Sequence, residues 1–345
     1  MSFASAALVA GIALTLGTLA VVGTLMGNSG PSDRFAVGPT APTGESALTE
    51  LPAGATDGIV RISVSHGTTD TVAGIMVLAN GHIITSADAL VGAERVLVTT
   101  SDGSVFTAVI VGVDPVTDIG VLDIEGNAHP TIPVANTADL TESGTTLVVE
   151  HNGADQAMAV TAGNINNIAA PLELPDGTTM HGMISSTLTR IPQSGASVLC
   201  SSTGSVAGLV TNRNRSDRTV YATPITYALH IAREIIAAGT ARHAWIGVLG
   251  VDRDASDSNG SAGSPRGTIV TEVAANGPAA QAGLQPKDII IDVMGSPIDS
   301  ASSLVVAIRE FDPGDLATVI YLRDGIRQSA VVTLGDRPAD VDAPR

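Results

Sequence analysis

Short runs of Val, Ile and Leu recur from residue 57 to about residue 214, and turn-forming residues separate them. The dipeptides Asn80-Gly81 and Asp102-Gly103 each stand between two such runs, and both favour tight β-hairpin turns. Aromatic residues form only 2% of the chain, so aliphatic side chains must build its core. Apolar runs at roughly 8–12-residue spacing are typical of an antiparallel barrel or sandwich, so this region is predicted to be mainly β.

The first strong helical pattern covers residues 224–238, PITYALHIAREIIAA, where apolar residues stand three and four positions apart. A proline opens the pattern and Gly239 follows it directly, and these are common start and stop signals of a helix. We therefore predict a first domain over residues 57–240. A second domain, over residues 244–336, mixes short strands with helical stretches at 279–282 and 302–310, which predicts an α+β fold.

The N-terminal residues 1–27 carry no charged side chain and are long enough for a helix to cross a bilayer core of about 30 Å. The alternative is a cleaved secretory signal, but the apolar run exceeds the core of about 7–15 residues that such signals have. We predict one transmembrane helix in the cell membrane, with the rest of the chain on the extracytoplasmic side. Residues 28–56 are predicted to be a flexible tether, and residues 337–345 a loose tail.

Charge and cysteine content exclude several classes of partner and site. The net charge of −17 repels nucleic acid, which is itself polyanionic, so no nucleic-acid partner is expected. Cys200 is the only cysteine, which rules out an intramolecular disulfide and a cysteine metal cluster. No metal site and no cofactor are predicted.

Two motifs connect the first domain to a known family. Residues 85–90 read TSADAL, and residues 114–122 read DPVTDIGVL. The pair resembles the patterns T-x-x-H-V-V and D-x-x-T-D-[LI]-A-V-L of the HtrA-type branch of the trypsin-like serine proteases. The resemblance implies a trypsin-like double β-barrel in which the catalytic aspartate falls at Asp118. The position of the catalytic histidine holds Asp88.

The replacement of that histidine bears directly on mechanism. The histidine of a serine-protease triad takes the proton of the nucleophile and later gives it to the leaving group, which needs a pKa near the working pH. Two neighbouring carboxylates tend to share one proton instead. The other histidines considered fall at strand or loop positions of the family pattern; they are His66, His82, His129 and His151. We expect no functional triad and interpret Asp118 as part of a buried turn.

The nucleophile segment supports the same interpretation. Residues 191–199 read IPQSGASVL where the family carries N-P-G-N-S-G-G-P-L, and two registers are open. If Ser194 takes the nucleophile's place, Pro192 replaces the glycine whose N–H stabilises the oxyanion, and proline has no N–H. If Pro192 and Leu199 are aligned with the family's Pro and Leu, the nucleophile position holds Gly195. A lost oxyanion donor costs about 10²–10³ in rate, so both registers predict a degraded site.

The second domain resembles the PDZ domain that follows the protease in this family. Residues 245–248, WIGV, are similar to its carboxylate-binding loop, and residues 277–290, GPAAQAGLQPKDII, are similar to a second PDZ pattern. In such loops, backbone N–H groups capture the C-terminal carboxylate of a peptide, whose main chain pairs with a strand edge. The resemblance implies that the peptide-binding residues are Trp245, Ile246, Gly247 and Val248, with a favourable charge from Arg242.

These observations predict a membrane-anchored, catalytically inactive HtrA-like protein outside the cytoplasm. Its PDZ domain and degenerate barrel would bind peptide C-termini or a protein partner, as an adaptor, a sensor or an accessory subunit of a larger membrane complex. The alternative is an active HtrA-like endopeptidase in envelope protein quality control, using Asp118, Ser194 and a nonstandard base. A trimer, the usual HtrA assembly, is not expected, because only Phe35 offers an aromatic contact near the start of the barrel.

Overall fold

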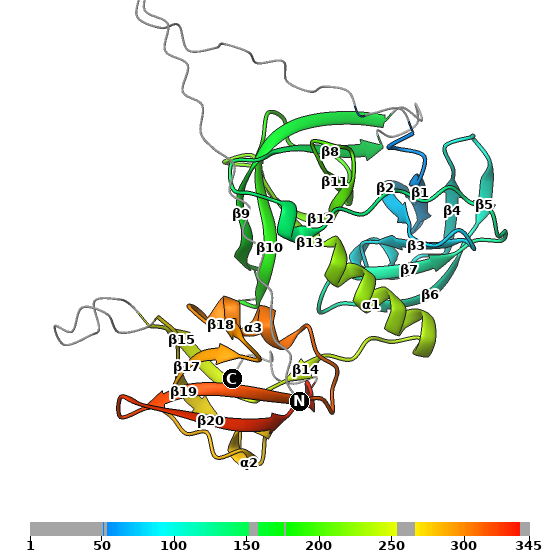
Figure 1. Ribbon diagram of the computed structural model, residues 1–345. Helices are drawn as coiled ribbons and strands as arrows, with labels where there is room; N and C mark the ends of the chain where they lie inside the picture. The colour runs from blue at the N-terminus through cyan, green and yellow to red at the C-terminus, as the bar shows by residue number, and fades with distance from the viewer. Residues whose placement is uncertain (1–50, 52–53, 152–157, 176, 254–265, 339–345) are drawn as a thin grey trace, which may run out of the picture. The chain divides into compact units, whose positions relative to one another are not determined.

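A computed structural model describes residues 51, 54–151, 158–175, 177–253 and 266–338. The predicted transmembrane helix over residues 1–27 and nearly all of the predicted tether lie outside these residues, as does most of the predicted tail. Within the described residues, no helix is both long and apolar enough to span a membrane. Strands dominate the described chain, as the spacing of the apolar runs predicts (Figure 1).

The first half of the barrel domain is a seven-stranded antiparallel sheet with the hydrogen-bonded order β5-β4-β1-β2-β3-β7-β6. Its strands are β1 (Ile59–Ser65), β2 (Thr69–Met76), β3 (His82–Thr85), β4 (Arg95–Thr99), β5 (Val105–Thr107), β6 (Val109–Asp114) and β7 (Ile119–Asp123). The two predicted hairpin turns lie between β2 and β3 and between β4 and β5. Both turn glycines, Gly81 and Gly103, adopt the positive φ angles that such turns favour.

The second half of the barrel domain closes on itself. Its six strands follow the order β10-β13-β12-β11-β8-β9 around a closed barrel. They are β8 (Thr145–His151), β9 (Met158–Glu173), β10 (Thr179–Leu188), β11 (Ser197–Ser201), β12 (Val206–Asn214) and β13 (Thr219–Pro224). The predicted mainly β architecture is therefore confirmed, although only this half forms a fully closed ladder of hydrogen bonds.

The predicted helix at the end of the first domain is α1 (Ile225–Ala238), one residue shorter at its start than the sequence pattern suggests. It ends at Gly239, whose left-handed backbone lets its N–H bond the carbonyl of Ile235 at 2.7 Å. The helix packs closely on β6. A Cβ added to Gly112 of this strand would clash with the carbonyl oxygen of Gly239, which ends the helix. Its buried isoleucines join one apolar core with residues from both sheets, and each contributes about 2 kcal/mol.

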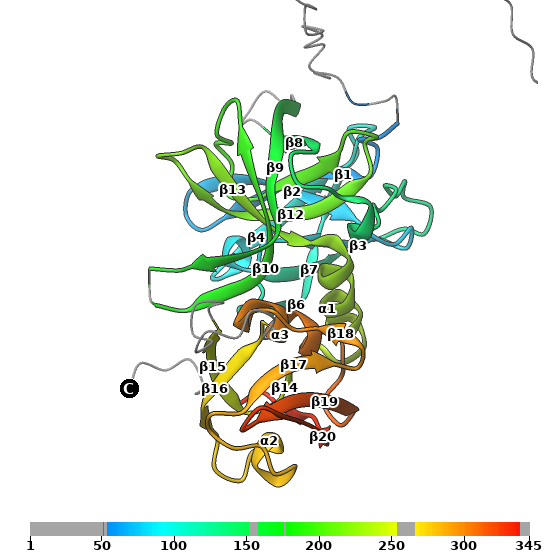
Figure 2. The same cartoon turned by 60° about the vertical axis from the view of Figure 1, so that its left-hand side comes forward.

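The second domain is built around the sheet order β15-β16-β17-β19-β20 and has its own apolar core. Its strands are β14 (Ala244–Trp245), β15 (Val248–Asp252), β16 (Thr268–Val273), β17 (Ile289–Val293), β18 (Ser296–Pro297), β19 (Leu316–Arg323), β20 (Ile326–Thr333) and β21 (Gly335–Asp336). The two predicted helices are α2 (Pro278–Gln281) and α3 (Ala301–Ile308), each displaced by one residue at its start (Figure 2). Ser300 and Ser303 form a capping box that begins α3.

Candidate functional site

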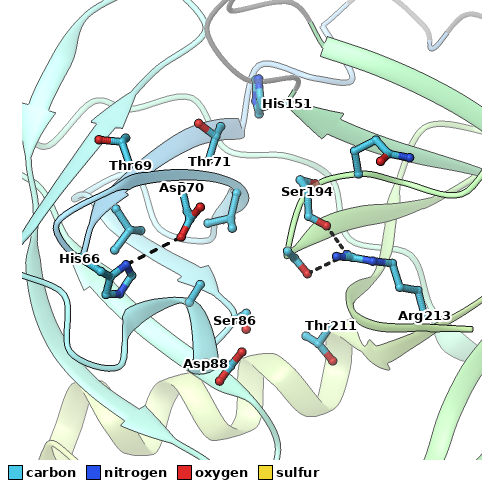
Figure 3. A pocket seen from close by; sticks show the side chains of 15 residues that line it. His66, Thr69, Asp70, Thr71, Ser86, Asp88, His151, Ser194, Thr211 and Arg213 are labelled. Atoms are coloured by element: carbon cyan, nitrogen blue, oxygen red, sulfur yellow. Dashed lines mark hydrogen bonds and ion pairs between the residues drawn. The ribbon is translucent and has the colours of Figure 1, made fainter. Parts of the chain in front are cut away.

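A cleft of about 530 Å³ lies between the two halves of the barrel domain (Figure 3). Asp88 lines it from the short 3-10 turn Asp88–Leu90, which follows β3, and its side chain is exposed. The backbone N–H of Asp88, not its carboxylate, contacts Asp118, donating to Oδ1 at 2.8 Å. The contact between these two residues is therefore not the shared proton between carboxylates that the sequence analysis expected.

Asp118 organises the turn that carries Asp88. Its carboxylate accepts the hydroxyl of Ser86 at 2.8 and 3.0 Å, in addition to the N–H of Asp88. Its φ of 54° lies in the left-handed region, which aspartate tolerates better than most side chains. Burial raises the pKa of Asp118 and the charge of Asp88 raises it further, against the opposing effect of these hydrogen bonds. Asp118 is half-buried and accepts these local hydrogen bonds at the end of a turn in which Pro115 and Val116 are exposed.

Ser194 and Gly195 lie on the opposite wall of the cleft, in the loop before β11. The Ser194 hydroxyl donates to the carbonyl of Ala196 at 2.9 Å and contacts the hydroxyl of Ser197 at 3.1 Å. Among the described residues, no histidine is a hydrogen-bond partner of Ser194. Gly195 is exposed, and a Cβ there would lie 3.2 Å from Val72 of β2, so this residue faces the first half of the domain across the cleft.

Glu150, at the end of β8, holds the nucleophile loop from the inside of the domain. Its side chain is 1% exposed and accepts the backbone N–H groups of Gln193 at 2.5 Å and Ser194 at 3.1 Å. The guanidinium of Arg190 donates to its other oxygen at 3.1 Å. Two N–H groups of the loop are therefore bound to an internal carboxylate. The sequence interpretation missed Glu150, although an acidic residue inside the apolar run TTLVVEH was a signal for it.

Arg213 of β12 is a second residue that the sequence interpretation missed. Its Nη1 donates to the carbonyl oxygens of Ser194 and Gly195, so that the guanidinium spans the loop (Figure 3). Burial lowers the pKa of Arg213, and the nearby positive charge of Arg215 lowers it further. No sequence motif marks this residue, because its contact with the loop exists only once β12 and the loop are folded together.

Two histidines line the cleft, and neither is hydrogen-bonded to Ser194. His66 lies 4.0 Å from Asp70, on the hairpin between β1 and β2. His151 is 7% exposed, and neither of its ring nitrogens has a hydrogen-bond partner within the described residues. Burial, together with the charge of Arg61, lowers the pKa of His151 to about 4, so its imidazole is neutral at pH 7.

The predicted carboxylate-binding loop lies at the edge of the second domain's sheet. Trp245 pairs with Gly335 in the short β14–β21 ladder, and Ile246 is buried in the domain core. Gly247 has a φ of 82°, and Val248 opens the edge strand β15. Ile246, Val248 and Leu249 line a cavity together with Leu304 and Ile308 of α3. This edge is suited to pairing with an extended peptide.

Arg242 lies between the two predicted domains and is bonded to a residue of each. Its Nε donates to the carboxylate of Asp336 in β21 at 2.9 Å, and its backbone N–H donates to Glu234. The hydrogen bond to Asp336 is also the main cause that raises the pKa of Arg242. A bound carboxylate would therefore have to compete with Asp336 for the charge of Arg242.

The chain matches two protein-family models, a trypsin-like peptidase domain over residues 59–209 and a PDZ domain over residues 247–334. It is 31% identical over 272 residues to a probable periplasmic serine endoprotease, DegP-like, of Pseudomonas savastanoi pv. phaseolicola, covering 77% of this chain and 56% of the relative. A protein of the same description from Pseudomonas fulva is 29% identical over 274 residues, with the same coverage of both chains. The chain thus spans little more than half the length of these curated relatives.

Solved structures show the same fold. The HtrA-type protease AlgW with a tripeptide superposes with a TM-score of 0.68 at 23% identity, covering 83% of this chain and 97% of that one. The serine endoprotease from Yersinia pestis superposes with a TM-score of 0.55, also at 23% identity, covering 84% of this chain and 100% of that one. Fold and site thus define a trypsin-like peptidase domain followed by a PDZ domain. The fold is similar to that of HtrA-type proteases, and the relatives are described as DegP-like endoproteases.

Proposed function

We propose that this chain is a peptide-binding HtrA-type protein whose barrel domain does not cleave its ligand. The observation that carries the proposal is the nucleophile loop, in which Glu150 accepts the N–H groups of Gln193 and Ser194. Acyl transfer needs N–H donors aimed at the oxyanion and a base at the nucleophile. Asp88 in place of the family's histidine, and the loop contacts to Glu150, support binding without acyl transfer.

The PDZ domain supplies the main ligand site in this proposal. A peptide or protein C-terminus would add to the edge of β15, with its carboxylate at the loop formed by Trp245, Ile246, Gly247 and Val248. Leu249 and Val251 of β15 are half exposed, at 50% and 52%, and offer apolar contacts along this edge. The barrel cleft would bind a second, internal peptide segment.

The proposed location is the extracytoplasmic side of the cell membrane. The periplasmic descriptions of the relatives support the extracytoplasmic part of this proposal. Anchoring in the lipid bilayer rests on the uncharged apolar run over residues 1–27. In that place the protein would act as an adaptor, a sensor or an accessory subunit of a membrane complex.

The second candidate function is that of an active endopeptidase of the cell envelope. It is favoured by the two relatives named above, which are described as probable periplasmic serine endoproteases. In this case Ser194 would be the nucleophile, and the loop would have to leave Glu150 before it could present N–H donors to a substrate.

A fluorophosphonate probe, which labels reactive serines, separates the two candidates. The purified protein is incubated with the probe and, in parallel, with unfolded casein, with Ser194→Ala as the matched control and trypsin as the positive control. We expect neither labelling nor cleavage. Labelling at Ser194, or casein cleavage that Ser194→Ala abolishes, would establish the endopeptidase instead.

A further inference from the structure

Arg213 lines the cleft, and one edge of its guanidinium is unoccupied among the described residues. Its Nη1 is held by the carbonyl oxygens of Ser194 and Gly195. Within the part of the chain that the structure describes, Nε and Nη2 have no hydrogen-bond partner, and neither is a buried unpaired atom. Two parallel N–H groups therefore remain open on one side of a side chain that is fixed on its other side.

The positive charge of Arg213 lacks a direct counter-ion. No ion pair joins Arg213 to an acidic residue among the described residues. Glu150 is the acidic group that acts on its charge, but both Glu150 oxygens are occupied, by the loop N–H groups and by Arg190. An anion at the open edge would therefore add an interaction that the protein itself does not make.

The geometry of this edge selects the class of anion. The Nε and Nη2 groups of a guanidinium lie in one plane and match the two oxygens of a carboxylate, which makes such pairs bidentate and strong. Asp88 and Asp70 line the opposite side of the cleft (Figure 3). These charges disfavour a polyanion, so a ligand with a single carboxylate directed at Arg213 fits better than a polyphosphate.

We propose that the barrel cleft contains a carboxylate-binding subsite in which the Nε and Nη2 edge of Arg213 receives one acidic group of a peptide. The source of that carboxylate is an Asp or Glu side chain or a C-terminus. The subsite rests on the proposed function, because it gives the cleft the ligand preference of a binding protein. Glu150 supports it indirectly, since it holds the loop whose carbonyl groups position Arg213.

The test uses the full-length protein and a pool of hexapeptides that are acetylated at the N-terminus and amidated at the C-terminus. The caps remove the terminal carboxylate that a PDZ domain recognises, so retained peptides report on other sites. We expect retained peptides to be enriched in Asp or Glu at one position. The best peptide is then compared with its Glu→Gln or Asp→Asn counterpart, and with that counterpart carrying a free C-terminal carboxylate.

Arg213→Gln should weaken binding of the acidic peptide by about tenfold to a hundredfold and remove its advantage over the neutral counterpart. Arg213→Lys keeps a charge at the loop carbonyls but loses the planar fork, so it should lose most of the same advantage. Arg215→Gln is the matched control, because it removes an equal charge from the exposed turn two residues away. Arg213-dependent binding of the free-carboxylate peptide would identify a C-terminus as the source.

Three outcomes would overturn the subsite. Retained peptides without acidic enrichment, combined with free-carboxylate peptides whose binding does not depend on Arg213, would leave peptide binding intact but refute the role of Arg213. An equal loss in Arg213→Gln and Arg215→Gln would indicate diffuse attraction instead of a defined site. If the wild-type protein retained no capped peptide and bound free-carboxylate peptides no more tightly than Arg213→Gln does, the subsite and the proposed binding function of the cleft would both fail.

Discussion

The barrel cleft and the PDZ loop differ in which atoms would perform their function. In the PDZ loop, backbone groups at the edge of β15 are proposed to bind the ligand, and its sequence WIGV remains similar to the family pattern. The cleft of a serine protease depends on side chains and on loop N–H groups, and here its lining includes Asp88 and Arg213. A few substitutions can therefore change the chemistry of a cleft while its fold is kept, whereas a backbone site changes only with its backbone conformation.

The largest expected effect concerns the buried carboxylate of the cleft. Glu150→Ala removes the acceptor of two N–H groups and the partner of Arg190, and should lower the free energy of unfolding by about 3–5 kcal/mol. Urea unfolding measures the loss. Glu142→Ala, on the exposed turn before β8, is the control and should change stability by less than about 0.5 kcal/mol. A loss below about 1 kcal/mol for Glu150→Ala would mean that this carboxylate does not hold the loop.

A second prediction concerns acid stability. The pKa of His151 is lowered to about 4 in the folded protein, so the unfolded chain binds this proton more tightly. Stability is then lost as the pH falls below about 6.5, and the loss reaches about 3 kcal/mol near pH 4. His151→Leu should remove this part of the pH dependence in unfolding experiments between pH 7 and pH 4. An unchanged pH dependence would show that His151 is not buried in neutral form.

Gly247→Ala tests whether the loop of the PDZ domain binds a peptide C-terminus. A Cβ at Gly247 would lie 3.3 Å from both Pro278 and Trp245, at a φ of 82° that side chains rarely adopt. We expect about tenfold weaker binding of a peptide with a free C-terminus, measured by fluorescence anisotropy. Gly325→Ala is the control, because its φ is 77° but nothing lies within 4 Å of the added Cβ. Equal affinity in both variants would place the ligand elsewhere.

The smallest expected effect is the return of the missing histidine. Asp88→His should produce no measurable casein cleavage, because the Ser194 hydroxyl remains bonded to Ala196 and the loop N–H groups remain bonded to Glu150. A serine-dependent activity in this variant, abolished by an added Ser194→Ala, would contradict that expectation. It would also make residue 88 the single cause of the difference between this cleft and that of an active protease.

Much of the fold could be predicted from the sequence, because the signals involved are local. Short alternating apolar runs indicated strands, and the helix ending at Gly239 followed from its periodicity and its terminal glycine. The PDZ domain followed from motifs spread over its length, and a family model confirms it over residues 247–334. The closure of the second half into a barrel did not follow, because hydrogen bonding between distant strands leaves no periodic pattern in either strand.

The candidate site was predicted only in part. Asp88, Asp118 and the loop around Ser194 were found through the resemblance to short family motifs, in which each of them lies. Glu150 and Arg213 were not, because Glu150 bonds Gln193 from 43 residues away and Arg213 bonds Ser194 from 19 residues away. Neither pairing has a sequence pattern of its own.

The sequence by itself determined the class of each domain and the absence of a histidine at residue 88. Strand periodicity, turn residues and residue identity are local properties that neighbouring positions reveal. Only the tertiary structure decided what surrounds the cleft. Folding brings the end of β8 beneath the nucleophile loop and β12 beside it, so that a buried carboxylate takes the loop's N–H groups and a guanidinium takes its carbonyl groups. Such contacts depend on distance in space, which residue order alone does not supply.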